Sequence, residues 1–251
     1  MTDAHQPPNG DNPFDEIADE YEAWYSTPLG SFVIAEEQEA LLEAVSGATG
    51  RLLEVGAGTG WWSRILARRG FIVTALEPSS AMRRIGAAQS AEPIAWVAGT
   101  ADRLPAPDGA FDVVLLMTVL EFLPEPAGAL REAWRVVRPG GRLVVGHLDA
   151  LSPWAALYRR LGDRGVAPWT RARFVESDDV ANWLGRPPDA RRSCVFLAPG
   201  ASPPFEEADR AGRLAGNAGA HARTAARGRR RRRAAARGCR GGADEATGPP
   251  A

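Results

Sequence analysis

Lysine is absent from this chain of 251 residues, and cysteine occurs only twice. Cys194 and Cys239 are too few for a disulfide framework, and they lack the spacing of a metal site. The sequence also has no apolar run of about eighteen residues and no N-terminal signal with a basic start and an apolar core. These absences predict a cytoplasmic protein without a membrane partner or a bound metal.

Basic residues are missing from the first fifty positions, apart from one histidine, whereas eleven acids occur there. From Glu206 onward the balance reverses to eleven arginines against five acids, with consecutive arginines at 229–233. Residues 1–13 are polar and rich in proline, which predicts disorder. Residues 206–251 are rich in Arg, Ala and Gly, which predicts a second disordered segment.

Large apolar side chains nearly vanish after Phe205, where Leu214 is the only large aliphatic residue. Three interpretations compete: an arm that binds nucleic acid through phosphates, a solvated tail, and a frameshift near Gly216 that replaces the native C-terminus. We favour the frameshift, because no strand pattern follows Gly216 and no aromatic residue interleaves the arginines as base stacking would need. An alternative reading frame in the genomic DNA that encodes an apolar strand would support it.

The most informative stretch is Leu52-Leu-Glu-Val-Gly-Ala-Gly-Thr-Gly60, where a buried strand breaks into three alternate glycines. Such a turn before a helix lets the backbone and its amides approach a ligand closely. Trp61 stands where a dinucleotide fingerprint requires its third glycine, which disfavours an NAD-dependent oxidoreductase. A second apolar run ends at Glu77, about twenty residues after the first glycine, where an acid would meet a ribose.

Buried-strand patterns alternate with helical patterns along the first two thirds of the chain, at 51–55, 71–76, 94–97, 111–117 and 142–148. An apolar run such as 111–117, which only Asp112 interrupts, is typical of a parallel strand that is buried on both faces. The predicted fold class is therefore α/β, with a doubly wound parallel sheet.

The glycine loop and Glu77 are followed in order by Gly99-Thr-Ala-Asp-Arg-Leu-Pro105, Phe111-Asp-Val-Val-Leu-Leu116 and Val137-Arg-Pro-Gly-Gly-Arg-Leu-Val-Val145. This series resembles the strand motifs of the class I S-adenosylmethionine-dependent methyltransferases, in particular the type 11 group of the small-molecule branch. The resemblance implies a Rossmann-like domain over 14–205, with N-terminal helices over 14–46 and a second lid segment over 151–174. It also implies a final antiparallel strand, which we expect to be missing or replaced here.

The same resemblance implies S-adenosylmethionine as the cofactor. Glu54 would help to hold its ammonium group, and Glu77 would accept hydrogen bonds from both ribose hydroxyls, a task that suits a carboxylate. Met82 fits core packing equally well, and Thr100 stands where the family often has an aspartate. The other candidates for cofactor binding are Tyr21, Gly56, Ala57, Gly58, Gly60, Pro78, Ala101 and Met117.

Methyl transfer requires mainly the alignment of a nucleophile with the sulfur–carbon bond, and a base only where the acceptor must lose a proton. Candidate catalytic residues near the ends of the fourth and fifth strands are Glu121 and His147, with Thr118 and Asp149 close by. His147 would end a strand on the side where such sheets bind ligands, although a structural histidine explains it equally well.

The predicted function is methyl transfer to a small, partly apolar acceptor, because the lid segment holds Trp154, Tyr158, Trp169 and Phe174. Two alternatives stay open: a protein that binds the cofactor without catalysis, and a nucleic-acid methyltransferase that uses the basic tail. The second is disfavoured, because residues 1–204 carry nineteen arginines against 26 acids. The motifs specify neither the acceptor nor the oligomeric state.

Overall fold

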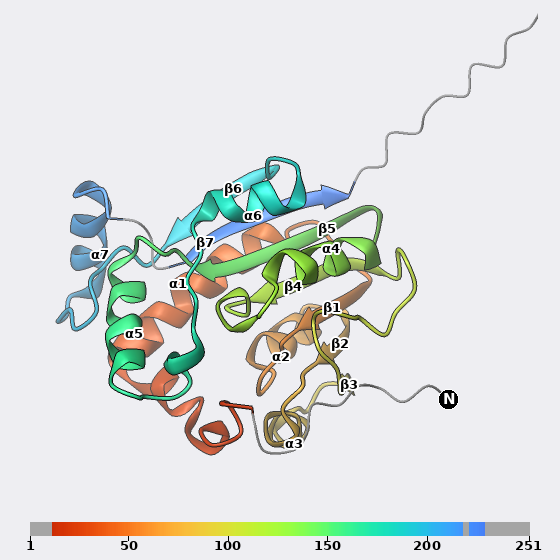
Figure 1. The fold of residues 1–251 in the computed structure, drawn as a ribbon, viewed down its shortest axis with the longest axis horizontal. Coiled ribbons are helices and arrows are strands. Elements are labelled where there is room, and N and C mark those ends of the chain that lie inside the picture. The colour runs from red at the N-terminus through yellow and green to blue at the C-terminus, as the bar shows by residue number, and fades with distance from the viewer. Residues whose placement is uncertain (1–11, 218–220, 229–251) are drawn as a thin grey trace, which may run out of the picture.

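The computed structural model describes residues 12–217 and 221–228. In these residues seven strands form one sheet in the order β3-β2-β1-β4-β5-β7-β6 (Figure 1). Strands β1 to β5 pair in parallel, whereas β7 is antiparallel to both of its neighbours. The strands are β1 (Arg51–Val55), β2 (Ile72–Leu76), β3 (Ile94–Val97), β4 (Phe111–Met117), β5 (Val137–Leu148), β6 (Ala190–Cys194) and β7 (His221–Gly228).

Both faces of the sheet are buried, as the central strand β4 shows. Val114 and Leu116 belong to one core cluster, whereas Val113, Leu115 and Met117 belong to the other. Successive side chains of a strand point to opposite faces, so a strand that is buried on both faces carries apolar residues on both. Residues 113–117 show this pattern, and the parallel pairing of β4 with β1 and β5 confirms the predicted α/β fold.

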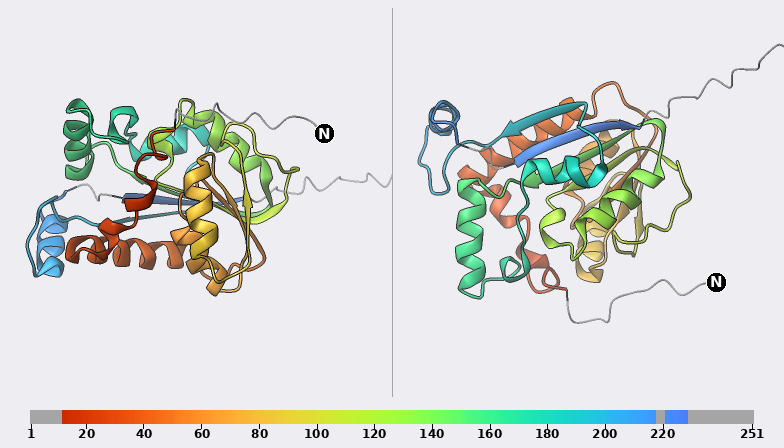
Figure 2. Two further views of the ribbon diagram at one scale, coloured as in Figure 1. Left: turned by 90° about the horizontal axis from the view of Figure 1, so that it is seen from below. Right: turned by 45° about the horizontal axis from the view of Figure 1, so that its top comes forward.

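Helices cover the two faces in separate layers. On the face toward the viewer of Figure 1 lie α4 (Pro126–Val136) and α6 (Ser177–Leu184), and on the far face lie α1 (Pro28–Ala44) and α2 (Trp61–Arg68). Figure 2 shows the same layers from below and with the top of the molecule tilted toward the viewer. The other helices are α3 (Ser80–Gln89), α5 (Pro153–Asp163), α7 (Phe205–Leu214) and the short 3-10 helices η1 (Ala18–Glu20), η2 (Ala23–Ser26), η3 (Leu120–Phe122) and η4 (Trp169–Arg171).

Hydroxyl side chains set the start of three helices. The hydroxyls of Thr27, Ser79 and Ser152 accept backbone N–H groups at 3.0, 3.0 and 3.1 Å at the starts of α1, α3 and α5. Such caps satisfy donors that the first turn of a helix leaves without a partner. Of the two serines that follow Glu77, Ser79 is the cap, and this fixes where α3 begins beside β2.

The C-terminal region corrects the prediction that the final antiparallel strand is missing, and it corrects the predicted disorder of 206–251 where the structure describes that segment. Residues 205–214 form α7, and 221–228 form β7 between β5 and β6. Strand pairing uses backbone N–H and C=O groups, so a segment of Ala, Arg and Thr pairs without the apolar pattern that we required. The frameshift interpretation loses this support and stays a prediction for the genomic DNA. The arginine run 229–233 and Cys239 lie outside the described residues.

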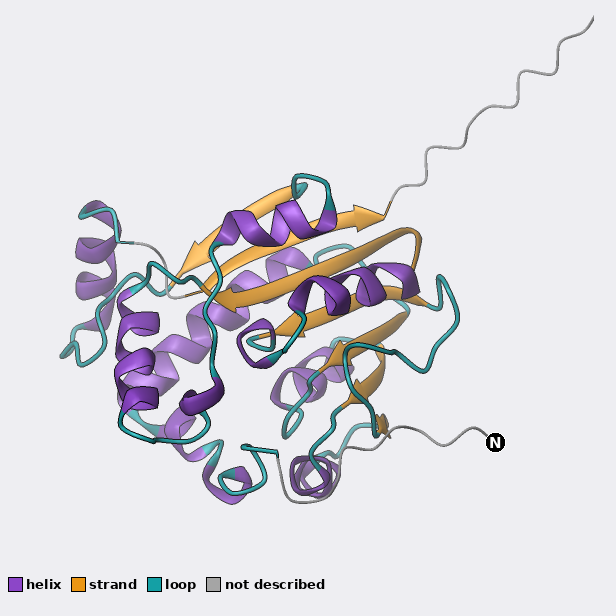
Figure 3. Cartoon of the chain, viewed as in Figure 1, coloured by secondary structure: helices purple, strands orange, loops and turns teal. Residues whose placement is uncertain are grey.

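The carboxyl ends of β1, β2, β4 and β5 meet at one edge of the sheet, because these strands are parallel. Figure 3 shows β4 and β5 pointing toward α5, whereas β7 points the opposite way. Parallel α/β sheets bind ligands beyond the carboxyl ends of their strands. This edge is therefore where a functional site is expected.

Candidate functional site

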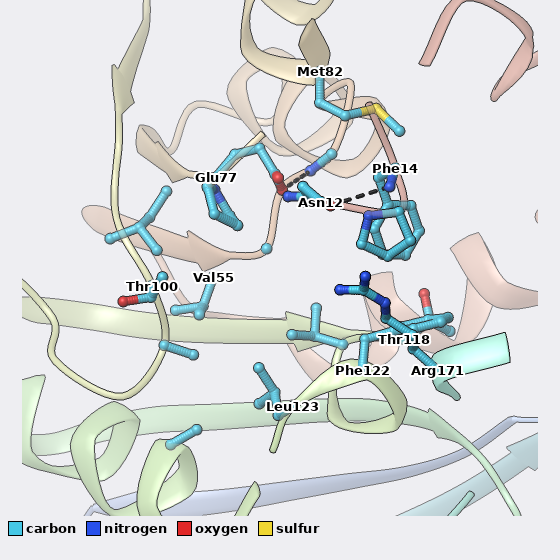
Figure 4. Close-up of a pocket in the computed structure, with 18 of the residues that line it drawn as sticks. Asn12, Phe14, Val55, Glu77, Met82, Thr100, Thr118, Phe122, Leu123 and Arg171 are labelled. Carbon is cyan, nitrogen blue, oxygen red and sulfur yellow. Dashed lines mark hydrogen bonds between the residues drawn. The ribbon is translucent and has the colours of Figure 1, made fainter. Parts of the chain in front are cut away.

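A cavity of about 670 Å³ lies at the carboxyl ends of β1, β2 and β4. Figure 4 shows its lining side chains converging from the N-terminal segment, the loops after these strands and η4. The predicted site residues that line it are Tyr21, Gly56, Gly58, Glu77, Pro78, Met82, Thr100, Ala101 and Met117. The predicted site residues that do not line it are Glu54, Ala57, Gly60, Glu121 and His147.

Glu77 has the most defined environment of the lining residues. Its Oε2 accepts the Gly58 N–H at 2.8 Å, and its Oε1 accepts the Ser79 N–H at 2.8 Å. The residue is 5% exposed, and this burial raises the pKa of its carboxyl group above the ordinary value, against the lowering effect of the two amides. The amides fix the direction of both oxygens, and each oxygen keeps a lone pair for a further donor.

Two glycines bring the loop after β1 close to its neighbours. Gly56 has φ +71°, and a Cβ there would lie 2.6 Å from a methyl group of Val119. Gly58 has φ +56°, and a Cβ there would lie 3.9 Å from the Tyr21 ring. A side chain at either position would be strained and would narrow the cavity.

Glu54 lies beneath this loop, and not in the cavity wall. It is 1% exposed, and its carboxyl group accepts a hydrogen bond from the hydroxyl of Ser63. Burial raises its pKa to about 8, so the protonated form prevails at neutral pH. Gly60 directly precedes α2 and has φ +79°. A Cβ at this position would lie 2.8 Å from the Trp96 ring, so the missing side chain makes room for that ring.

Side-chain hydrogen bonds and an ion pair hold the N-terminal segment beside the cavity, at Asp15 and at Glu22. Asp15 accepts the hydroxyl of Ser79, at the start of α3. Glu22 accepts the hydroxyl of Thr59, and it forms an ion pair with Arg64 at 2.8 Å. Arg64 is 8% exposed, so this pair is sheltered from solvent. These contacts hold the N-terminal segment against the loop after β1 and the start of α3.

Aromatic side chains from three separate segments form a closed series of neighbours, each ring within 6.3 Å of the next. We call the eight residues the aromatic belt. In order of contact they are Phe14, Tyr21, Tyr25, Trp24, Trp154, Tyr158, Trp169 and Phe122. Phe14, Tyr21 and Phe122 also line the cavity, so the belt forms its wall on one side.

The three tyrosines of the belt stay protonated at neutral pH. Burial raises the pKa of Tyr21 to about 12, and it raises the pKa values of Tyr25 and Tyr158 as well. The negative charge of the buried Glu37, on α1, adds to the shift at all three. None of these hydroxyls is therefore suited to act as a base.

The two predicted catalytic residues are parts of a buried network behind the cavity. His147 is 0% exposed, and its Nε2 lies 3.5 Å from the hydroxyl of Ser177. That hydroxyl donates to Asp149 at 2.8 Å, and the Glu121 carboxylate accepts the Leu148 N–H. The network ties the end of β5 to η3 and to the start of α6, which is a structural task.

Sequence reasoning missed several lining residues, among them Val119, Phe122 and Arg171. The first two follow the end of β4 by a few positions, so the rule that ligands bind beyond strand ends could have found them. No local signal marks Arg171, because tertiary packing alone brings η4 to the cavity.

Among the residues that the structure describes, no helix has the length and hydrophobicity needed to cross a membrane. No group of three or more His, Cys, Asp or Glu side chains among them is arranged to hold a metal ion.

Comparison with known proteins places these features in a family. A family model described as "Methyltransferase domain" matches residues 53–145. An uncharacterised protein of Methanocaldococcus jannaschii is 31% identical over 69% of this chain and 78% of its own length. An uncharacterised protein of Mycobacterium tuberculosis is 32% identical over 72% of this chain, and the match spans 62% of that relative.

Proteins with an assigned name among the matches are also methyltransferases. A demethylmenaquinone methyltransferase of Renibacterium salmoninarum is 34% identical over 58% of this chain and 62% of its own length. A solved structure from Thermotoga maritima, described as a SAM-dependent methyltransferase and possible histamine N-methyltransferase, shares the fold. Its TM-score is 0.68 at 23% identity, with 86% of this chain and 99% of that chain covered. The chain belongs to the class I S-adenosylmethionine-dependent methyltransferases.

Proposed function

We propose that this protein transfers the methyl group of S-adenosylmethionine to a small, partly apolar acceptor. The observation that carries the proposal is one cavity with two unlike sides. One side holds Glu77, whose carboxylate is fixed by the amides of Gly58 and Ser79, and the other side is formed by the aromatic belt. A cofactor and an acceptor can thus lie next to each other in a single space.

The residues on the first side fit the cofactor. Glu77 would accept the two ribose hydroxyls through its remaining lone pairs, and Leu76, Met82 and Ala101 offer an apolar slot for the adenine. The loop at Gly56 and Gly58 leaves room for the methionine end of the cofactor, because neither residue has a side chain. A Cβ would lie against Val119 at Gly56 and near the Tyr21 ring at Gly58. When bound, the cofactor supplies an activated methyl group on a sulfonium.

The residues on the second side would orient the acceptor and exclude water. Phe14, Phe122 and Leu123 form an apolar wall beside Thr118, which has φ +50° directly after β4. Alignment of this kind supplies most of what methyl transfer needs from a protein. Since Glu121 and His147 do not line the cavity, we propose that neither of them acts as a base toward the acceptor.

The burial of these two residues also favours a second candidate function. Because neither predicted catalytic residue lines the cavity, a cofactor-binding role that involves no catalysis, such as sensing, also fits. The nucleic-acid alternative depends on the basic run 229–233, which lies outside the described residues.

Calorimetric titration with S-adenosylmethionine and S-adenosylhomocysteine, with NAD as the control, tests the proposal first. We expect the first two to bind in the micromolar range and NAD to give no signal. Methyl transfer is then assayed over a panel of small acceptors, which includes the demethylmenaquinone and histamine named for the relatives. Binding without turnover on any acceptor would favour the sensing role, and the absence of binding would refute both.

A further inference from the structure

Charge is unevenly distributed among the described residues that line the cavity. Arg171 is the only one of them with a positive charge, whereas four are acids: Asp15, Glu77, Asp102 and Glu125. Glu77 and Asp15 are both engaged at Ser79, where the cofactor side lies. In Figure 4 the Arg171 side chain extends into the cavity beside Thr118 and Phe122, and it lies across the cavity from Glu77.

The backbone on both sides of Arg171 is held in place. Trp169 stacks on Tyr158 with ring centroids 3.7 Å apart and an interplanar angle of 11°. The Arg171 N–H donates to the Pro168 carbonyl at 3.2 Å, and the Arg173 N–H donates to the Glu121 carbonyl at 2.7 Å. The aromatic belt therefore sets the position from which the arginine reaches the cavity.

We propose that Arg171 binds a carboxylate of the acceptor, so that the substrate is a small organic acid with an apolar or aromatic body. This inference rests on the methyltransferase function proposed above. A guanidinium presents its donors in a planar fork that matches a carboxylate in a bidentate manner. The body of such an acid would pack against Phe14, Phe122 and Leu123, which line the same side.

The charges favour a carboxylate over a phosphate. A phosphate monoester carries nearly two negative charges at neutral pH and takes several strong donors. Here the lining holds one arginine and four acids, so a group with a single negative charge is the better match. The carboxylate of the cofactor itself is the other anion to consider, and the experiment separates the two.

The experiment is a titration of the full chain, saturated with S-adenosylhomocysteine, with benzoate, benzamide, benzylamine and phenyl phosphate. Benzoate is expected to bind about tenfold more tightly than benzamide, at the lower end of what a charged hydrogen bond contributes, because Arg171 is partly solvated. In Arg171→Gln this preference is expected to vanish. Arg173→Gln is the matched control, since this arginine belongs to the same segment and does not line the cavity; it is expected to keep the preference.

Several results would overturn the inference. They are a benzoate preference that survives in Arg171→Gln, tighter binding of benzylamine or phenyl phosphate than of benzoate, and no binding of any probe to protein that holds S-adenosylhomocysteine. If Arg171→Gln weakens S-adenosylhomocysteine as much as benzoate, the arginine serves the cofactor and the inference also fails. Failure of S-adenosylhomocysteine to bind to the unmodified chain would instead refute the proposed function.

Discussion

The two sides of the cavity are built in different ways. The side at Glu77 is made by loops that directly follow β1 and β2, and its defining contacts are backbone amides and glycines. The side at Phe122 is made by side chains of the N-terminal segment, η3, α5 and η4, which meet only in the folded chain. A ligand on the first side depends on local backbone geometry, whereas a ligand on the second depends on tertiary packing.

The largest expected effect comes from Glu54, beneath the first side. Burial raises its folded-state pKa from the ordinary 4.5 to about 8. The free energy of unfolding that Glu54 contributes is therefore fully present below its unfolded pKa of 4.5. It is lost as the pH rises through the folded pKa of about 8. The slope in this window approaches about 1.4 kcal/mol per pH unit.

Glu54→Gln keeps the shape of the side chain and removes its titration, so we expect the variant to lose this slope. The free energy of urea unfolding, measured from about pH 5 to about pH 8 without cofactor, checks it. If wild type and variant lose stability in parallel over this range, Glu54 does not titrate as the structure indicates.

Glu77→Ala tests the first side directly. A charged hydrogen bond contributes about 1.5–3 kcal/mol, so we expect S-adenosylhomocysteine to bind at least about tenfold more weakly. The variant also leaves the Gly58 and Ser79 amides without their acceptor. Asp108→Ala, at an acid whose side chain is 80% exposed, is the control and should leave the affinity unchanged. Equal affinities in calorimetry would remove Glu77 from the ribose role.

Gly56→Ala and Gly47→Ala separate backbone strain from close approach. Both glycines have positive φ, at +71° and +69°, so each substitution costs about 1–2 kcal/mol of stability. A Cβ at Gly47 would meet nothing within 4 Å, whereas at Gly56 it would press on Val119, which lines the cavity. We expect cofactor affinity to fall only in Gly56→Ala. A similar fall in both variants, measured by titration, would attribute the effect to strain alone.

Trp169→Leu tests the second side and has the smallest expected effect. The stacked pair with Tyr158 contributes about 0.5–1.5 kcal/mol beyond the buried area. We expect a lower melting temperature and an unchanged affinity for S-adenosylhomocysteine. If cofactor affinity falls together with stability, the two sides are not separable in the way that their construction suggests.

The sequence predicted the first side well, because the information there is local. Glycines at alternate positions after a buried strand, and an acid at the end of the next strand, specify their roles within a few residues. The same reasoning could not separate Gly56, which faces the cavity, from Gly60, whose missing side chain makes room for Trp96 on β3. That distinction depends on a contact between distant segments.

The second side of the cavity and the strand β7 were harder to predict, because they too depend on contacts between distant segments. His147 and Glu121 lie near strand ends, but their burial in a network with Ser177 follows from the packing of α6. Arg171 has no local signature. Strand β7 pairs through backbone groups, so it can form although its sequence has no apolar pattern. Composition alone was therefore a poor guide to whether the last strand exists.

Phe14 and Tyr21 belong at once to the aromatic belt and to the wall of the cavity, so the two ligands would share part of one surface. If a bound cofactor settles these side chains, the acceptor meets a wall that is already ordered. The two binding equilibria would then be linked, and linkage is reciprocal: the acceptor raises cofactor affinity by the same factor by which the cofactor raises acceptor affinity. Cofactor affinity measured alone would in that case understate the affinity in the ternary complex.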